Sequence, residues 1–513
     1  MKKQTLTQGT MILMIAGFAT KILGMINRII VARLLGEEGM GIFMLIQPTI
    51  MLLATLASIG LPIAIPTLIS RANTRQKNIL TVSLIIAMIS SLIVSFILFA
   101  TARDLAVTFL KDERTFLPLI TIGPLLFFIS FSTILKAYFQ GEQNMTPSAV
   151  STFVEQIIRT ITSIVFVTVM MPRGIIYGVV GIMWASIAGE LASSIILIFM
   201  FFKNMKVNHK GANLKPPRLS SNNFKEVISI SLPTTGSRLI GSFTHFLEPI
   251  IVVQALFRIG YSSIESGKMY SAVAGFALPV LLMPSFVSQA VTQSIIPAIS
   301  QAYQRKNLTL IHRHLNIAFQ LSFFICGLYT VFVMIFPTEI MTLLYNTTTG
   351  SEFLLIMAPF FLLLHFQSIL TATLQSIDEA KLTMNASLIS SIIKISLLVF
   401  LLQVPQLNIK GLVISVLAHI FILTAWNYRL VQKKTHYRAN YGSIINGILI
   451  LGITYLFGYY LNSTVIFVSH SMLNVLILMG IITFAYISLT ALCGLFPKQL
   501  LGGKRSKETS CLL

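Results

Sequence analysis

Basic or protonatable side chains interrupt two apolar stretches of this 513-residue sequence at the same spacing. The stretch 231–249, SLPTTGSRLIGSFTHFLEP, carries Arg238 and His245, and a stretch near the N-terminus carries Lys21 and Arg28. Residues seven apart on an α-helix point within about 20° of each other, so each pair lies on one helical face. Two cationic faces in an apolar surround would bind an anion strongly, and phosphate is the usual biological anion.

The apolar surround is expected to be a membrane, which limits where such groups can lie. A charge at the centre of a membrane helix costs at least about 2.5 to 3.5 kcal/mol on insertion scales, so it should face protein or water. Local satisfaction is an alternative: Arg28 could reach the membrane surface, and His245 could be a buried hydrogen-bonding residue. Because two helices carry the same pattern, we favour a shared central cavity that binds substrate through Lys21, Arg28, Arg238 and His245.

Six further intramembrane residues are second-tier candidates for the cavity or for coupling to an ion, and one of them is Asn27, next to Arg28. Glu155 and Arg159 sit one helical turn apart, and we interpret them as a structural ion pair. Lys394 takes the place of Arg159 in the second half of the chain, with no acid in the place of Glu155. Glu190 is either a proton or ion site or a helix-packing acid, and Glu248 lies at the edge of the cationic face of its helix.

The elements that must position these residues are membrane-spanning helices. The sequence is 55% hydrophobic and only 10% charged, with a mean hydropathy of +0.84, which indicates a membrane protein rather than a soluble one. Apolar runs of about 20 residues, enough to cross a bilayer core of about 30 Å, recur along the whole length. We predict an all-α polytopic membrane protein with fourteen transmembrane helices: 10–33, 42–68, 78–101, 115–138, 147–170, 178–202, 224–256, 269–298, 314–337, 355–376, 384–403, 409–430, 443–461 and 472–495.

The first twelve spans fall into two six-helix repeats. SRLIGSFTH at 237–245 aligns with TKILGMINR at 20–28, which places Arg238 on Lys21 at an offset of 217 residues. Three further segments match in the same order at offsets of 231 to 235. In transporters with parallel repeats of this kind the substrate path runs between the halves. The predicted regions are an N-terminal lobe at 1–215, a C-terminal lobe at 216–430, and two added helices with a basic tail at 431–513.

The net charge of +21 comes from juxtamembrane loops rather than from one soluble face. The N-terminal stretch has features of a signal peptide, but thirteen spans follow it, so we interpret it as the first helix. Positively charged short loops stay on the cytoplasmic side, and most Lys and Arg residues lie on the side of both termini. We predict a multi-pass cell membrane protein with cytoplasmic termini, whose basic loops contact anionic lipids and not nucleic acid.

The sequence has no motif for catalysis or for a resident cofactor. It lacks HExxH, CxxC and Walker A patterns, and no pair of carboxylates is placed for acid–base catalysis. Cys326, Cys493 and Cys511 show neither a disulfide framework nor metal-ligand spacing. We expect no enzyme activity, no cofactor and no metal, and a transport step that draws on an ion gradient, the membrane potential or the substrate gradient.

Four segments resemble the polysaccharide transport branch of the multidrug/oligosaccharidyl-lipid/polysaccharide exporter superfamily: GTMILMIAGFATKILGMINRIIVARLLGEEGMGIFML, AYFQGEQNMTPSAVSTFVEQIIR, SLPTTGSRLIGSFTHFLEPIIV and MAPFFLLLHFQSIL. The resemblance covers nearly the whole chain. It implies a V-shaped, two-lobed transporter that works by alternating access and carries lipid-linked precursors, with their polyprenyl diphosphate, across the cytoplasmic membrane. Because this branch includes sporulation proteins, the resemblance also implies a role in synthesis of the spore cortex peptidoglycan.

The related lipid II flippases carry two arginines in the first helix, at the cavity. This sequence has Lys21 at the position of the first and Asn27 at that of the second, while Arg28 lies one position later, about 100° further around the helix. The resemblance thus implies a substrate role for Lys21 and places Arg28 outside the family pattern. The drug and cation antiporter branch relies on membrane acids, and the acids of this chain do not match its pattern.

The function expected is therefore a flippase for a lipid-linked peptidoglycan or polysaccharide precursor. Two alternatives stay open. A cation-coupled multidrug or metabolite antiporter on the same scaffold would depend on an essential acid. A membrane scaffold that recruits cell-wall synthases through its basic loops, such as 203–225, would transport nothing.

Overall fold

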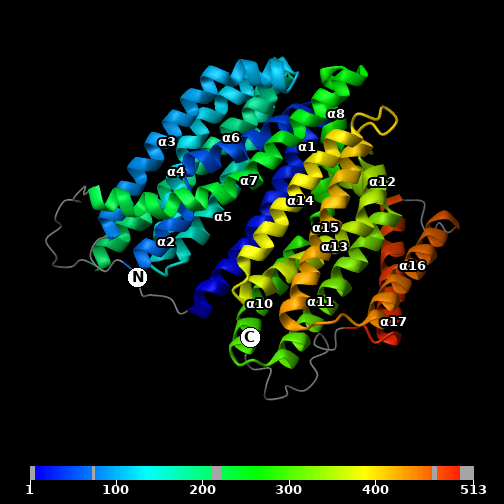
Figure 1. Cartoon of the computed structure of the whole chain (residues 1–513). Helices are drawn as coiled ribbons and strands as arrows, with labels where there is room; N and C mark the ends of the chain where they lie inside the picture. Colours follow the sequence, from blue (N-terminus) through cyan, green and yellow to red (C-terminus); the bar gives the residue numbers. More distant parts are fainter. Residues whose placement is uncertain (1–5, 72–75, 209–220, 465–470, 497–513) are drawn as a thin grey trace. The chain divides into compact units, whose positions relative to one another are not determined.

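The computed structural model describes residues 6–71, 76–208, 221–464 and 471–496. These residues form helices joined by short connections, with no β-strand among them (Figure 1). The α-helices are α1 (Leu6–Ser58), α2 (Leu61–Arg71), α3 (Gln76–Asp104), α4 (Phe116–Gly141), α5 (Thr146–Met170), α6 (Ile175–Asn208), α7 (Ser221–Ile259), α8 (Ser263–Ser271), α9 (Leu278–Leu281), α10 (Ser285–Gln304), α11 (Leu308–Ile335), α12 (Pro337–Tyr345), α13 (Ser351–Ser376), α14 (Ala380–Leu401), α15 (Lys410–Thr435), α16 (Tyr441–Thr464) and α17 (Ser471–Leu492). Two π-helices, η1 (Leu105–Phe109) and η4 (Ala272–Ala277), and two 3₁₀ turns, η2 (Glu113–Thr115) and η3 (Met171–Arg173), lie between them.

The described helices confirm an all-α polytopic membrane protein. Twelve are long and apolar enough to cross a membrane, or thirteen when one bent pair is counted as a span. The bent pair, Ser263–Leu281 and Ser285–Gln304, turns by 51° and takes the place of the predicted straight span 269–298. Pro284 lies at the bend, where its ring removes a backbone donor. The number of fourteen spans stays a prediction.

Helix α1 folds back on itself at Gly36. A straight helix of its 53 residues would be about 80 Å long, far more than a bilayer core. Gly36 has φ 64° and ψ −171°, a conformation that residues with a Cβ rarely adopt. We call the segments before and after Gly36 the two arms of α1. Arg28 lies eight residues before Gly36 and Met44 eight residues after it, and Arg28 Nη2 is 3.3 Å from Met44 Sδ, so the two arms run side by side. Helix α1 therefore takes in the predicted span 10–33 and the first part of the predicted span 42–68, and α2 takes in the rest.

The chain packs into two compact units. Unit 1 comprises Met1–Gly275 and Leu402–Ile409, and unit 2 comprises Phe276–Leu401 and Lys410–Leu513. Helices α7 and α8 belong to unit 1 because they pack on α1. The unit boundary thus lies later in the sequence than the predicted lobe boundary at 215, and the two predicted repeats stay a prediction.

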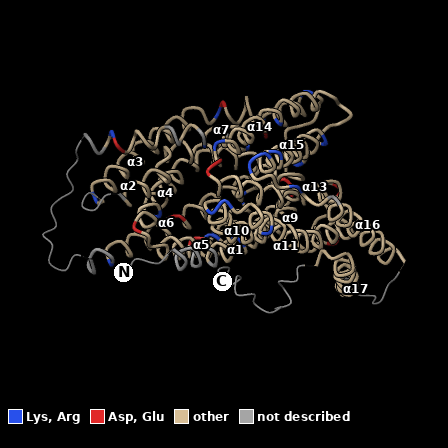
Figure 2. The backbone as a smooth tube through the Cα atoms, turned by 60° about the horizontal axis from the view of Figure 1, so that its bottom comes forward, with Lys and Arg blue, Asp and Glu red and all other residues tan. Residues whose placement is uncertain are grey.

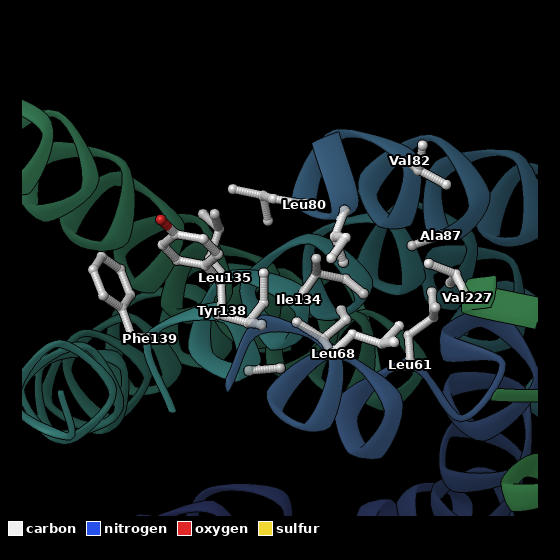
Figure 3. Packing of buried hydrophobic residues seen from close by; sticks show 14 of the residues in the cluster. Leu61, Leu68, Leu80, Val82, Ala87, Ile134, Leu135, Tyr138, Phe139 and Val227 are labelled. Carbon is white, nitrogen blue, oxygen red and sulfur yellow. The ribbon is translucent and has the colours of Figure 1, made fainter. Parts of the chain in front are cut away.

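Each unit has its own apolar core. In unit 1, side chains from α2, α3 and α4 meet in a cluster that includes Leu68 and Ile134 (Figure 3). In unit 2, a cluster from α10, α11 and α13 includes Ile299 and Leu315, and a second one joins α11 to α17. Such packing between helices, rather than exclusion from water, is what holds membrane helices together.

Charged residues are sparse along these helices (Figure 2). The backbone tube is mostly tan, and short blue and red segments mark the few Lys, Arg, Asp and Glu residues. A charged side chain within an apolar stretch is costly, so each one is expected to face other parts of the protein or water.

Helices α1 and α8 approach each other closely at Gly41 and Gly267. A Cβ on Gly41 would lie 3.0 Å from the carbonyl carbon of Gly267 and 3.1 Å from its oxygen, and these backbone atoms cannot rotate away. We expect Gly41→Val to lower stability by about 1 to 3 kcal/mol, because overpacking forces the helices apart. The apparent melting temperature of the purified protein measures this. Gly17→Val is the matched control on the same helix, since nothing lies within 4 Å of its Cβ position; equal melting of the two variants would contradict the prediction.

Candidate functional site

Three of the four predicted substrate-binding residues are exposed on unit 1, and we call them the cation row: Lys21, Arg238 and His245. Lys21 belongs to the first arm of α1, and the other two belong to α7. Lys21 and His245 lie within stretches that can span a membrane, whereas Arg238 lies three residues before the stretch Gly241–Ile259.

Helix α7 contacts the second arm of α1 between Arg238 and His245. The hydroxyl of Ser242, between the two α7 members, lies 3.0 Å from the hydroxyl of Thr55 on the second arm of α1. Lys21 is fifteen residues before the Gly36 break and Thr55 is nineteen after it. Because the two arms run side by side, this difference of four residues is about 6 Å along the helix axis. By this count Lys21 is level with Thr55 along the helix axis, and its closeness to Arg238 and His245 stays a prediction.

The charge balance of two members of the cation row, Lys21 and Arg238, follows from their described contacts. Among the residues that the structure describes, no carboxylate forms an ion pair with Lys21 or Arg238. Both side chains are exposed rather than packed in a protein core. Two positive charges that form no ion pair with a described acid would attract an anion.

The fourth predicted residue, Arg28, contacts a helix backbone. Its side chain is half-buried, and Nη2 donates a hydrogen bond to the carbonyl oxygen of Ala274 at 2.9 Å. Ala274 lies in the π-helix η4, which follows α8. Next to Arg28, the Asn27 side chain is half-buried, and its Oδ1 atom is buried with no hydrogen-bond partner.

Glu248, the acid of α7, is buried with 6% of its surface exposed. It accepts a long hydrogen bond from the Tyr270 hydroxyl on α8 at 3.5 Å. The structure therefore places this acid inside unit 1, whereas the His245 side chain three residues earlier is exposed.

The second-tier residues of the first half form a charged network between α4, α5 and α6. Arg159 Nη2 donates to Glu155 at 2.7 Å and lies 3.5 Å from a carboxylate oxygen of Glu190. Lys136 Nζ donates to the other oxygen of Glu155 at 2.8 Å, and the Ser132 hydroxyl donates to Glu190 at 2.6 Å. The predicted ion pair of Glu155 and Arg159 is thus present within a larger network.

This network is neutral and closely packed. Its two carboxylates are matched by two cations, and Glu155 and Glu190 are only 5% and 8% exposed. Gly189 permits the close approach of α6 to α5, since a Cβ there would lie 3.0 Å from both Arg159 Cβ and the Glu155 carbonyl oxygen. A neutral, buried network is suited to holding helices together and not to attracting an anion.

Two members of the network, Lys136 and Ser132, are absent from the sequence-based site. Lys136 lies near the end of the predicted span 115–138, where a basic residue is readily interpreted as reaching the membrane surface. The sequence signal that could have identified Lys136 is the one that identified Lys21: a basic residue inside an apolar run. Its pairing with Glu155 depends on how α4 packs against α5, which the spacing does not encode.

In unit 2, Lys394 is buried on α14 with 7% of its surface exposed. One turn earlier, at the place of Glu155, the Ser390 hydroxyl lies 2.7 Å from Nδ1 of His419 on α15. The second half therefore replaces the carboxylate of the first with a hydroxyl–imidazole contact.

The described residues contain no group of three or more His, Cys, Asp or Glu side chains that could hold a metal ion.

Comparisons with known proteins place the chain in a family. The family model described as polysaccharide biosynthesis protein matches residues 6–303, and a second model, MatE, matches residues 246–400. Stage V sporulation protein B of Bacillus subtilis (strain 168) is 37% identical over 438 residues, which covers 84% of this chain and 85% of that protein. The chain belongs to the polysaccharide biosynthesis protein family.

More distant relatives of this polysaccharide biosynthesis protein have the same fold. Lipid II flippase MurJ of Bacillus subtilis (strain 168) is 22% identical over 467 residues, 84% of this chain and 85% of that protein. A structure of lipid II flippase MurJ in an inward closed conformation matches with a TM-score of 0.69 at 16% identity, over 95% of this chain and 99% of the other. An inward-facing multidrug resistance MATE family transporter matches with a TM-score of 0.62 at 15% identity, over 81% and 94% of the two chains.

These findings confirm the expected membership of the exporter superfamily. Family and fold together make this polysaccharide biosynthesis protein a multi-pass membrane protein of the transporter class.

Proposed function

We propose that this protein is a flippase for a lipid-linked peptidoglycan or polysaccharide precursor. The observation that supports the proposal is that Lys21 on α1 and Arg238 on α7, two helices that pack on each other in unit 1, are exposed and form no ion pair with a described carboxylate. A polyprenyl diphosphate offers the multiply charged phosphate oxygens that Lys and Arg bind best. His245 extends the cation row and gains a full charge when it is protonated.

The saccharide would then cross the membrane next to the cation row, while the prenyl chain stays in the lipid. We also propose that both termini are cytoplasmic and that the basic loops contact anionic lipids. The relationship to stage V sporulation protein B supports a role in sporulation, and we propose the spore cortex peptidoglycan as the product that the transport serves.

The charge distribution favours this function over a cation-coupled antiporter. An antiporter of that kind would depend on Glu155, Glu190 or Glu248 and needs the acid to be available to its ion. Glu155 and Glu190 are already matched by Lys136 and Arg159, and Glu248 is 6% exposed next to the Tyr270 hydroxyl. The uncompensated charges on Lys21 and Arg238 are positive, so they suit an anionic substrate.

Purified protein in vesicles tests the proposal directly. Fluorescent lipid II in the inner leaflet should reach the outer leaflet at a rate proportional to the amount of protein. The Lys21→Gln/Arg238→Gln variant, reconstituted to the same density, should not exceed empty vesicles. If the wild type moves ethidium in a manner that depends on Glu190 and leaves lipid II in place, the antiporter function is correct instead.

A further inference from the structure

The π-helix η4 is an irregular turn that contains the boundary between the two units of the chain. π-Helical turns are rare and short, and they occur often at functional positions. The chain passes from unit 1 to unit 2 between Gly275 and Phe276, inside this turn. A few residues later the same span bends by 51°. Any change in the hydrogen bonding of η4 therefore alters how one unit is connected to the next.

Arg28 holds this turn from a neighbouring helix. Its guanidinium donates to the carbonyl oxygen of Ala274 at 2.9 Å, and a hydrogen bond from a charged donor is roughly twice as strong as a neutral one. The turn is seated tightly on the second arm of α1, because a Cβ on Gly275 would lie 3.1 Å from Met44 Cγ and 3.4 Å from Met40 Cε. Val273 and Gly275, on either side of Ala274, are buried, and Ala274 itself is half-buried.

The same guanidinium lies close to the proposed substrate. Arg28 follows Lys21 by seven residues on the first arm of α1, which is about 10 Å along the helix and on the same face. Phosphate oxygens are charged acceptors and compete well with a neutral backbone carbonyl for a guanidinium. A bound diphosphate would thus compete with the η4 carbonyl for the Arg28 guanidinium, which also contacts Met44 Sδ.

We propose that Arg28 is a positioning residue that couples diphosphate binding to the π-helical turn. Without ligand, Arg28 clamps η4 through the Ala274 carbonyl. When a diphosphate occupies the cation row, the guanidinium turns to the phosphate and the carbonyl loses its donor. A half-buried helix carbonyl that loses a charged donor needs another donor, so the turn rearranges its hydrogen bonds and rotates the helix after Gly275 relative to the helix before it. The coupling rests on the proposed function, whereas the clamp does not.

Hydrogen–deuterium exchange of the peptide that covers η4 tests the clamp without ligand. In the full-length protein in nanodiscs, Arg28→Gln should speed exchange of the 272–277 amides by about 10- to 100-fold, the range expected for loss of one charge-assisted hydrogen bond. Arg28→Lys keeps a charged donor, so its 272–277 amides should exchange at a rate between those of the wild type and Arg28→Gln. Lys21→Gln, the matched control on the same face, should exchange at the wild-type rate. Wild-type exchange in a folded Arg28→Gln variant would overturn the clamp.

Farnesyl diphosphate as a soluble probe tests the coupling. It should speed exchange of 272–277 in the wild type, farnesol should not, and Arg28→Gln should show no further increase. If farnesyl diphosphate binds in a Lys21-dependent manner without affecting this peptide, the coupling is wrong and the proposed function stands. If it does not bind, the proposed function and the coupling both fail, and the ligand-free comparison still decides the clamp.

Discussion

Replacement of Lys21 and Arg238 by glutamine is expected to stop transport while the protein stays folded in the membrane. Each side chain would make charge-assisted hydrogen bonds to the diphosphate that contribute about 1.5 to 3 kcal/mol. Loss of both corresponds to a fall of about two to four orders of magnitude in apparent affinity. Because both side chains are exposed and neither pairs with a described carboxylate, their neutralisation removes no structural contact.

Complementation in sporulating cells that lack the native protein measures this loss. The double variant should reach the membrane at normal levels and yield spores without cortex, and Lys21→Ala or Arg238→Ala alone should already impair cortex formation. Lys225→Gln and Arg258→Gln remove exposed cations elsewhere on α7 and should support normal spores. Normal cortex in cells that carry the double variant would refute the assignment of the cation row.

Arg159→Met is expected to cause the largest loss of stability, about 3 to 5 kcal/mol. The substitution leaves the buried Glu190 with only the Ser132 hydroxyl as a contact, and removal of one partner from a buried ion pair carries a penalty of this size. The apparent melting temperature in detergent should fall accordingly, and the amount of protein in the membrane should fall with it.

A double variant separates this charge effect from a simple loss of packing. Arg159→Met/Glu190→Met removes both charges, and apolar replacements of buried ion pairs are often neutral, so most of the lost stability should return. Lys136→Met is the comparison within the same network and should cost less, because Glu155 keeps Arg159 at 2.7 Å. A double variant that melts as low as Arg159→Met would show that packing of the guanidinium stem, and not charge balance, is what matters.

Patterns local to one helix were predictable from the sequence. Apolar runs of span length gave the helices, and the four-residue spacing of Glu155 and Arg159 gave their ion pair, which is present at 2.7 Å. The contacts of Lys136 and Ser132 were not predictable, because they depend on the rotation of α4 relative to α5 and α6. Helix rotation within a membrane bundle is set by packing, and many rotations fit one apolar sequence.

Arg28 illustrates the same limit at the candidate site. Its spacing from Lys21 correctly indicates a position on the same helical face, but its acceptor is a backbone carbonyl in a π-helix 246 residues away. Nothing in the sequence AVAGFA distinguishes a π-helical turn from an α-helical one. The fold-back of α1 was easier to anticipate, because one span was expected before Gly36 and another after it. A single straight helix of 53 residues would be longer than the bilayer core is thick.

The network between α4, α5 and α6 also has a consequence for biosynthesis. As they leave the ribosome, α4 brings one lone charge, Lys136, and α6 brings another, Glu190, and each costs about 2.5 to 3.5 kcal/mol to place in lipid by itself. Helix α5 carries Glu155 and Arg159, the contacts of both. We therefore expect these three helices to leave the translocon as a group, with α4 retained at its lateral gate until α5 has been made.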